Sequence, residues 1–215
     1  MKRLLDAFCC AGGATKGYQL AGFHVTGVDI NPQPRYCGDE FHQGDAVEFI
    51  REHGHEFDFI HASPPCQAHS NAQKIQKNEH PELIEPTREA LEASGRPWVI
   101  ENVVGAPLRS PVLLCGAMFG LRTYRHRLFE FSGHFQVPVP DHPEHVAKTT
   151  KMGRPVKDGE FMHIVGNFAG VDLAREIMDM PWANRRELAE AIPPAYTKYI
   201  GKYAMWSLNG LDKAA

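Results

Sequence analysis

Short apolar runs alternate with helical segments over the first 130 residues, and this alternation constrains the fold more than any other feature. We expect buried strands over residues 4–8, 24–28, 57–62, 98–101 and 124–131. Helices are expected to end near Ala21 and to run from Pro86 to Ser94, where Gly95 stops the second one. Strands that alternate with helices predict an α/β fold, in which a mostly parallel sheet carries helices on both faces.

The composition changes after Ser132, where prolines and polar residues replace the periodic pattern. We expect an irregular insertion over 132–180, with a short strand over 162–165 as its one regular element. Helices are then expected over 185–192 and from Tyr196 to Leu208. The predicted organisation is therefore one main domain, made of residues 1–131 and 181–215, with a small insertion between its two parts.

Composition and charge restrict the class of protein. Apolar residues make up 43% and charged residues 23% of 215, which fits one folded domain. No apolar run approaches the roughly 18 residues of a membrane helix, and no signal peptide is evident. The five cysteines form no C-x-x-C pair, so we expect reduced thiols in a cytoplasmic protein. The net charge is −3, yet residues 122–157 hold seven Lys or Arg against three acids, which indicates either a polyanion site or a solvated loop.

The ends of the first two strands carry residues suited to a nucleoside cofactor. Gly12 and Gly13 follow the first strand, where they allow a ligand to approach the backbone at a helix N-terminus. Asp29 ends the second strand, where a carboxylate can accept bonds from ribose hydroxyls. Asp45 is a further candidate, for contact with adenine, although a helix N-cap explains it better when it is taken alone. The alternative for the two glycines is a plain tight turn.

Reactive side chains follow the next strands. Cys66 comes after two prolines, on a loop where a thiolate could act as a nucleophile, although many free cysteines are inert core residues. Glu101 ends the strand after it, as a carboxylate at the same edge or as a helix cap. Arg125 and Arg127 share one face of a strand and could clamp a polar base edge or a phosphate. The alternative for both arginines is an exposed edge strand.

These positions together resemble a known family. The matching motifs, in chain order, are Asp6-Ala7-Phe8 to Gly13, Asp29, Gly44-Asp45, Pro64-Pro65-Cys66-Gln67, Glu101-Asn102-Val103, Arg125-His126-Arg127 and Ala191-Ile192-Pro193-Pro194. Over about residues 4–130 and 185–206, the sequence is similar to the DNA cytosine-5 methyltransferases that use S-adenosylmethionine. The resemblance implies a Rossmann-like class I methyltransferase fold, with residues 132–180 as a short target-recognition insertion.

The resemblance also implies roles for individual residues. Cys66 would add to C6 of a flipped-out cytosine, Glu101 would bind its N3/N4 edge, and Arg127, with Arg125 beside it, would bind its O2 edge. The residues implied to bind the cofactor are Phe8, Cys10, Gly12, Gly13, Asp29, Ile30, Asp45, Ala46, Pro64 and Glu190. Those expected to contact nucleic acid are Gln67, Ser70, Lys148, Lys151, Arg154 and Lys157.

The partner implied by the resemblance is double-stranded DNA, bound by a monomer, in a restriction-modification setting. An RNA (tRNA) cytosine-5 methyltransferase and a catalytically silent nucleic-acid-binding relative are the alternatives. No metal is expected, because His142 and His145 have a metal-like spacing but no third ligand is evident.

The sequence departs from the family pattern at several positions. Cys10 replaces the first glycine of the glycine-rich loop, and Thr123 replaces a glutamine. Ala189 and Glu190 replace a Gly-Asn pair, which places a carboxylate near the expected methionine end of the cofactor. This raises transfer of a group other than methyl as a minor alternative. The short insertion leaves few side chains to read a sequence in the major groove.

Overall fold

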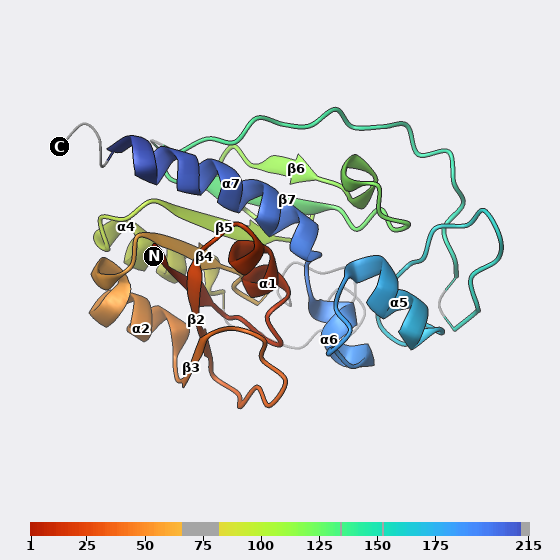
Figure 1. Ribbon diagram of the computed structural model, residues 1–215, viewed down its shortest axis with the longest axis horizontal. Coiled ribbons are helices and arrows are strands. Elements are labelled where there is room, and N and C mark those ends of the chain that lie inside the picture. The colour runs from red at the N-terminus through yellow and green to blue at the C-terminus, as the bar shows by residue number, and fades with distance from the viewer. Residues whose placement is uncertain (66–81, 134, 152, 212–215) are drawn as a thin grey trace.

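The computed structural model describes residues 1–65, 82–133, 135–151 and 153–211, and centres on one seven-stranded sheet (Figure 1). The strands are β1 (Arg3–Ala7), β2 (His24–Asp29), β3 (Glu40–Gln43), β4 (Phe59–Ala62), β5 (Trp98–Asn102), β6 (Val112–Leu114) and β7 (Arg127–Phe131). Their order in the sheet is β3-β2-β1-β4-β5-β7-β6. The first five strands of this order are parallel, whereas β7 runs antiparallel to both of its neighbours.

Helices cover both faces of the sheet. The α-helices are α1 (Gly13–Leu20), α2 (Ala46–His53), α4 (Ile84–Ala93), α5 (Val171–Met178), α6 (Arg185–Glu190) and α7 (Pro194–Leu211), with short 3-10 helices η1 (Gly54–Glu56) and η2 (Gly116–Phe119). On β1, Leu4 packs into the core under α1 and α7, whereas Leu5 packs into the core under α2 and α4. Alternate residues of a buried strand thus reach opposite helical layers. The predicted α/β fold is confirmed.

Helices α1 and α7 lie side by side because a glycine lets their backbones approach (Figure 1). A Cβ atom on Gly17 of α1 would stand 2.2 Å from the carbonyl oxygen of Pro194. Helix α7 begins at Pro194, two residues before the predicted start, since proline suits the first turn of a helix. This packing fixes the start of α7 against the start of α1.

The chain between β7 and α5 forms no helix or strand in the residues that the structure describes. Its one ladder contact is a bridge from Thr149 to Phe161, so the strand predicted over 162–165 is wrong. The backbone N–H of Met162 instead bonds the carbonyl of Arg122, and that of His163 bonds the Thr150 hydroxyl. Neither bond extends into a ladder, because no second strand lies alongside.

A separate small core holds the later part of the insertion. Its buried members include Met162, Ile164 and Ile177, together with Ala183 and Leu188 from the far side of the expected boundary at residue 180. The core therefore spans that boundary, and the division into domain and insertion stays a prediction. Within the described residues, no helix has the length and apolar character needed to cross a membrane.

Candidate active site

The loop between β1 and α1 has an unusual backbone. Phe8, Cys10 and Gly12 have positive φ angles of 62°, 45° and 86°. A Cβ atom on Gly12 would stand 2.7 Å from Cys37 Sγ, and one on Gly13 would stand 2.6 Å from the carbonyl oxygen of Ile192. No side chain therefore fits at either glycine, and the loop forms a tight turn at the N-terminus of α1.

Asp29 ties this loop to the end of β2. Its Oδ2 accepts a bond from the Cys10 backbone N–H at 3.0 Å, and its Oδ1 accepts one from Asn31 at 2.9 Å. Asp29 is buried, whereas Ile30 beside it is 63% exposed. A carboxylate oxygen can accept two bonds, so Asp29 keeps capacity for further donors.

Asp45 serves as the N-cap of α2. Its Oδ1 accepts bonds from Val47 N at 2.8 Å and from Glu48 N at 2.9 Å, while Ala46 is buried. The N-cap alternative from the sequence is confirmed. A contact of Asp45 or Ala46 with a cofactor stays a prediction.

A buried polar group beneath the loop was missed from the sequence. Thr15 Oγ1 donates to Asp6 Oδ2 at 2.5 Å, and the Tyr36 hydroxyl lies 3.1 Å from Thr15 Oγ1. Asp6 Oδ1 has no hydrogen-bond partner in the described part of the chain. Burial raises the pKa of Asp6 to about 7, against the lowering effect of the Thr15 bonds. Asp6 lies in the strand expected to be buried, but the sequence gave no signal for the contacts of Thr15 with Asp6 and Tyr36.

The segment around α6 closes the other side of the loop. Trp182 Nε1 donates to the Ala11 carbonyl at 2.8 Å. Glu190 forms an ion pair with Arg186 at 3.1 Å. Burial raises the pKa of the Cys10 thiol, and the charges of Asp29 and Glu190 raise it further. Cys10 is therefore a neutral thiol near two carboxylates.

Glu101 is a buried carboxylate at the end of β5. Burial raises its pKa, whereas the charge of Arg127, a hydrogen bond from Ser63 and the charge of Arg125 lower it. The Nε atom of Arg127 lies 2.9 Å from Glu101 Oε1. The structure thus brings together Glu101 and Arg127, as expected from the sequence.

A chain of polar side chains leads away from Glu101 into the core. Ser63 Oγ lies 2.9 Å from His61 Nε2, and His61 Nδ1 lies 3.0 Å from the Tyr18 hydroxyl. Burial lowers the pKa of His61 to about 3, which keeps its ring neutral. The sequence gave no reason to connect these residues, since they come from α1, β4 and the loop after β4.

Asn102 fixes the start of the loop after β4. Its Nδ2 donates to the Pro64 carbonyl at 2.9 Å, and its Oδ1 accepts from Val103 N at 2.9 Å. The hydrogen bond from Asn102 to Pro64 therefore joins the motif that begins at Glu101 directly to the motif that begins at Pro64. Cys66, Gln67 and Ser70 lie outside the described residues, and their roles stay predictions.

Arg125 is engaged with the backbone. It has a positive φ of 32°, and its guanidinium donates to the carbonyls of Ile164 at 2.6 Å, Ala189 at 2.8 Å and Ala191 at 2.6 Å. It therefore clamps the insertion and the α6 segment to the strand that carries Arg127. A contact of Arg125 with a base stays a prediction, whereas its positioning role is visible.

The basic residues of the insertion differ in their surroundings. Lys148, Lys151 and Lys157 are exposed. Arg154 Nη2 instead bonds both carboxylate oxygens of Glu160, at 2.8 and 2.9 Å. Three lysines are thus available to an external anion, whereas Arg154 is already neutralised within the protein.

The strand order and the cluster at the carboxyl ends of β1, β2, β4 and β5 define a Rossmann-like class I methyltransferase fold. No protein-family model and no curated protein matches the sequence. Solved structures do match. A candidate DNA modification methyltransferase from an E. coli prophage is 14% identical, with a TM-score of 0.68 over 98% of this chain and 100% of that one.

Two eukaryotic structures are similar as well. The Dnmt2 methyltransferase of S. pombe is 11% identical, with a TM-score of 0.63 over 97% of this chain and 100% of that one. The methyltransferase EhMeth of Entamoeba histolytica is 10% identical, with a TM-score of 0.58 over 97% and 99%. At these identities the similarity establishes the shared fold, which is the fold that the sequence motifs imply.

Proposed function

We propose that this chain is an S-adenosylmethionine-dependent enzyme that methylates C5 of cytosine in double-stranded DNA. The observation that carries the proposal is the buried Glu101–Arg127 pair, which Asn102 and Pro64 join to the segment leading into Cys66. A carboxyl group and a guanidinium that meet at one edge can bind the N3 and O2 edges of a cytosine. The methyltransferase fold of the structural neighbours supports the same reaction class.

The residues around the β1–α1 loop fit the cofactor. Gly12 and Gly13 allow the tight turn at the N-terminus of α1, and Asp29 has capacity to accept bonds from the two hydroxyls of a ribose. Ile30, which is exposed beside Asp29, would supply apolar surface to the cofactor, and Phe8 and Pro64 are expected to contribute to the same pocket. When bound, the cofactor supplies a methyl group on a positively charged sulfur. Cys10 and Glu190 would lie towards its methionine end.

Residues of the chain supply the thiolate nucleophile and the hydrogen-bond donor to N3 of the cytosine. The Cys66 thiolate would form a bond to C6, and the electron pair of the C5–C6 double bond would form the new bond from C5 to the methyl carbon, while the methyl–sulfur bond breaks and leaves its electron pair on sulfur. Glu101 donates a hydrogen bond to N3 and so stabilises the charge that develops on the ring, while Arg127 binds O2. Loss of the C5 proton to a base restores the double bond and expels the Cys66 thiolate. The cytosine must leave the duplex to reach these groups.

Transfer to defined substrates tests the proposal. The untagged full chain is incubated with radiolabelled S-adenosylmethionine and either duplex DNA or tRNA, and nucleosides are identified by mass spectrometry. We expect 5-methylcytosine in DNA. Cys66→Ala should abolish transfer and leave cofactor binding by calorimetry within about twofold. Glu101→Gln should slow transfer by about 10²–10⁴-fold, whereas the exposed control Glu92→Gln should not.

The other outcomes distinguish the alternatives. Label in tRNA and not in DNA would identify an RNA methyltransferase, and cofactor or DNA binding without transfer would identify a silent relative. DNA with 5-fluorocytosine should form an adduct with Cys66 that survives denaturation, because fluorine cannot leave C5 as a cation. An adduct mapped to another cysteine would reassign the nucleophile.

A further inference from the structure

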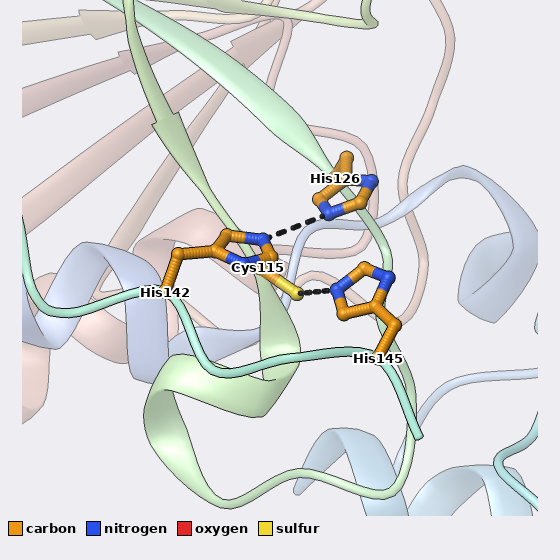
Figure 2. A group of neighbouring side chains, drawn as sticks. All are labelled: Cys115, His126, His142 and His145. Atoms are coloured by element: carbon orange, nitrogen blue, oxygen red, sulfur yellow. Dashed lines mark hydrogen bonds between the residues drawn. The ribbon is translucent and has the colours of Figure 1, made fainter. Parts of the chain in front are cut away.

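Four side chains from three separate parts of the chain meet beside η2 (Figure 2). Cys115 follows β6, His126 precedes β7, and His142 and His145 lie in the irregular stretch of the insertion. Their potential ligand atoms all lie within 4.8 Å of one another. A thiol and three imidazoles are the donors that zinc prefers in proteins.

Two distances within the group are close to those of a tetrahedral site. Cys115 Sγ lies 3.4 Å from His145 Nε2, and His126 Nε2 lies 3.2 Å from His142 Nε2 (Figure 2). Zn–S and Zn–N bonds of about 2.3 and 2.0 Å place neighbouring ligand atoms of a tetrahedron roughly 3.3–3.6 Å apart. The two measured edges are close to this range before any adjustment of the side chains.

Backbone groups next to Cys115 hold its sulfur in place. Its side chain is buried, and the backbone N–H groups of Ala117 and Met118 donate to Sγ. These bonds form because the chain turns sharply at Gly116, where a Cβ atom would stand 2.0 Å from the Thr123 carbonyl oxygen. Hydrogen bonds of this kind orient a metal-bound sulfur and stabilise its negative charge.

The histidine of the insertion that lies nearest the thiol is also held in place. The His145 ring stacks on Tyr124 with ring centroids 3.6 Å apart. The Tyr124 hydroxyl in turn donates to the Ala147 carbonyl at 2.9 Å and accepts from the Ala147 N–H at 3.0 Å. The backbone next to His145 is therefore fixed to the same loop that leads to His126.

Apolar burial does not explain why this part of the insertion lies here. The side chains of residues 141–146 are all exposed, and the segment forms no helix or strand. A metal that joins distant positions can replace a hydrophobic core in such a segment. The cluster contains two ligands that the spacing of His142 and His145 alone did not reveal.

We propose that Cys115, His126, His142 and His145 bind one structural Zn²⁺. Four protein ligands fill a tetrahedral ion, which leaves no open position for catalysis. The ion joins the insertion to Cys115, which directly precedes η2, and to His126, which directly precedes β7. Because His126 lies between Arg125 and Arg127, the ion also steadies the segment that presents Arg127 to Glu101. The proposal departs from the expectation of a metal-free protein and does not depend on the identity of the methylated substrate.

Metal content of the untagged full chain tests the proposal. Protein purified from zinc-containing medium should hold one zinc per chain by mass spectrometry of the metal. After replacement of zinc by Co²⁺, the visible spectrum should show the intense bands of a tetrahedral site and a sulfur-to-cobalt charge-transfer band. Less than about 0.2 zinc per chain, together with a cobalt spectrum like that of the free hydrated ion, would overturn the proposal.

Variants assign the ligands. His142→Ala and His145→Ala change exposed side chains, and each should weaken zinc binding by more than about tenfold against a chromophoric chelator. Cys115→Ala should remove the charge-transfer band. His163→Ala is the matched control, because His163 is an exposed histidine of the same insertion outside the cluster. Equal zinc affinity in His142→Ala, His145→Ala and the control would refute these ligands.

Discussion

Arg127 Nε and Glu101 Oε1 lie 2.9 Å apart at the end of β5, in a pair whose side chains are 15% and 8% exposed. Burial raises the pKa of the Glu101 carboxyl group, whereas the neighbouring Arg127 guanidinium lowers it. Because its pKa is raised on balance, this carboxyl group keeps a proton at higher pH than an ordinary glutamate and can still bind a polar edge. The proposed reaction needs such a group beside N3 of the cytosine.

Ser63 should tune this balance as a positioning residue. Its hydroxyl bonds Glu101 and so favours the charged carboxylate. Ser63→Ala should therefore raise the pKa of Glu101 and move the alkaline limb of the pH profile of kcat/KM upwards by about 0.5–1 unit. The measurement is the rate of methyl transfer across pH. An unchanged profile with a lower rate would show that Ser63 acts only through packing.

The regular core of the fold could be predicted because its signals are local. β1, β2, β4 and β5 are apolar runs buried on both faces, and α1 and α4 have clear ends. β3 was missed because Glu40–Gln43 is a mostly polar, exposed strand at the sheet edge, and its place depends on pairing with β2. Helix α5 was missed because it packs on the small core of the insertion.

The candidate site could be predicted where motifs stand at strand ends, as for Asp29 and Glu101. Contacts between distant segments could not. Arg125 bonds carbonyls of an irregular segment at Ile164 and of the end of α6, and the histidines near Cys115 come from irregular segments far from it in the sequence. Such contacts depend on tertiary packing, which local sequence patterns do not specify.

Asp6 should make the stability of the protein depend on pH. Its pKa in the folded state is about 7, against 3.8 ordinarily, so between these values the folded state binds a proton that the unfolded state has lost. The free energy of unfolding therefore falls as pH rises through this window. Asp6→Asn cannot ionise, and its amide oxygen can still accept the Thr15 bond. Its stability relative to the wild type should thus increase from about pH 4 to 7 and then level off.

Urea denaturation at several pH values measures this difference. The exposed control Asp172→Asn should show a constant difference from the wild type, because its carboxylate is 95% exposed. Parallel stability curves for Asp6→Asn and the wild type would show that Asp6 ionises normally in the fold.

The exposed lysines of the insertion should contribute to the salt dependence of DNA binding. Lys151→Ala and Lys157→Ala should each lower the slope of log Kd against log salt by about one, because each phosphate contact releases about one counterion. Arg154→Ala should change the slope less, since Glu160 already neutralises this guanidinium. Lys202→Ala on α7 is the control. A slope that falls equally in the control would assign the DNA to another surface.

The buried Arg88–Glu130 pair should be the costliest charge pair to break. Nε and Nη2 of Arg88 bond the two oxygens of Glu130 at 2.7 and 2.8 Å, and the side chains are 1% and 4% exposed. Arg88→Met leaves the carboxylate buried without its partner and should lower the free energy of unfolding by about 3–5 kcal/mol. Arg88→Met combined with Glu130→Gln should recover part of this loss, because the remaining amide is uncharged and still accepts the Arg109 N–H. Urea denaturation measures the loss. Breaking the exposed ion pair of Arg175 and Asp172 should lower the free energy of unfolding by at most about 1 kcal/mol. A loss as small for Arg88→Met would mean that water reaches the Glu130 carboxylate.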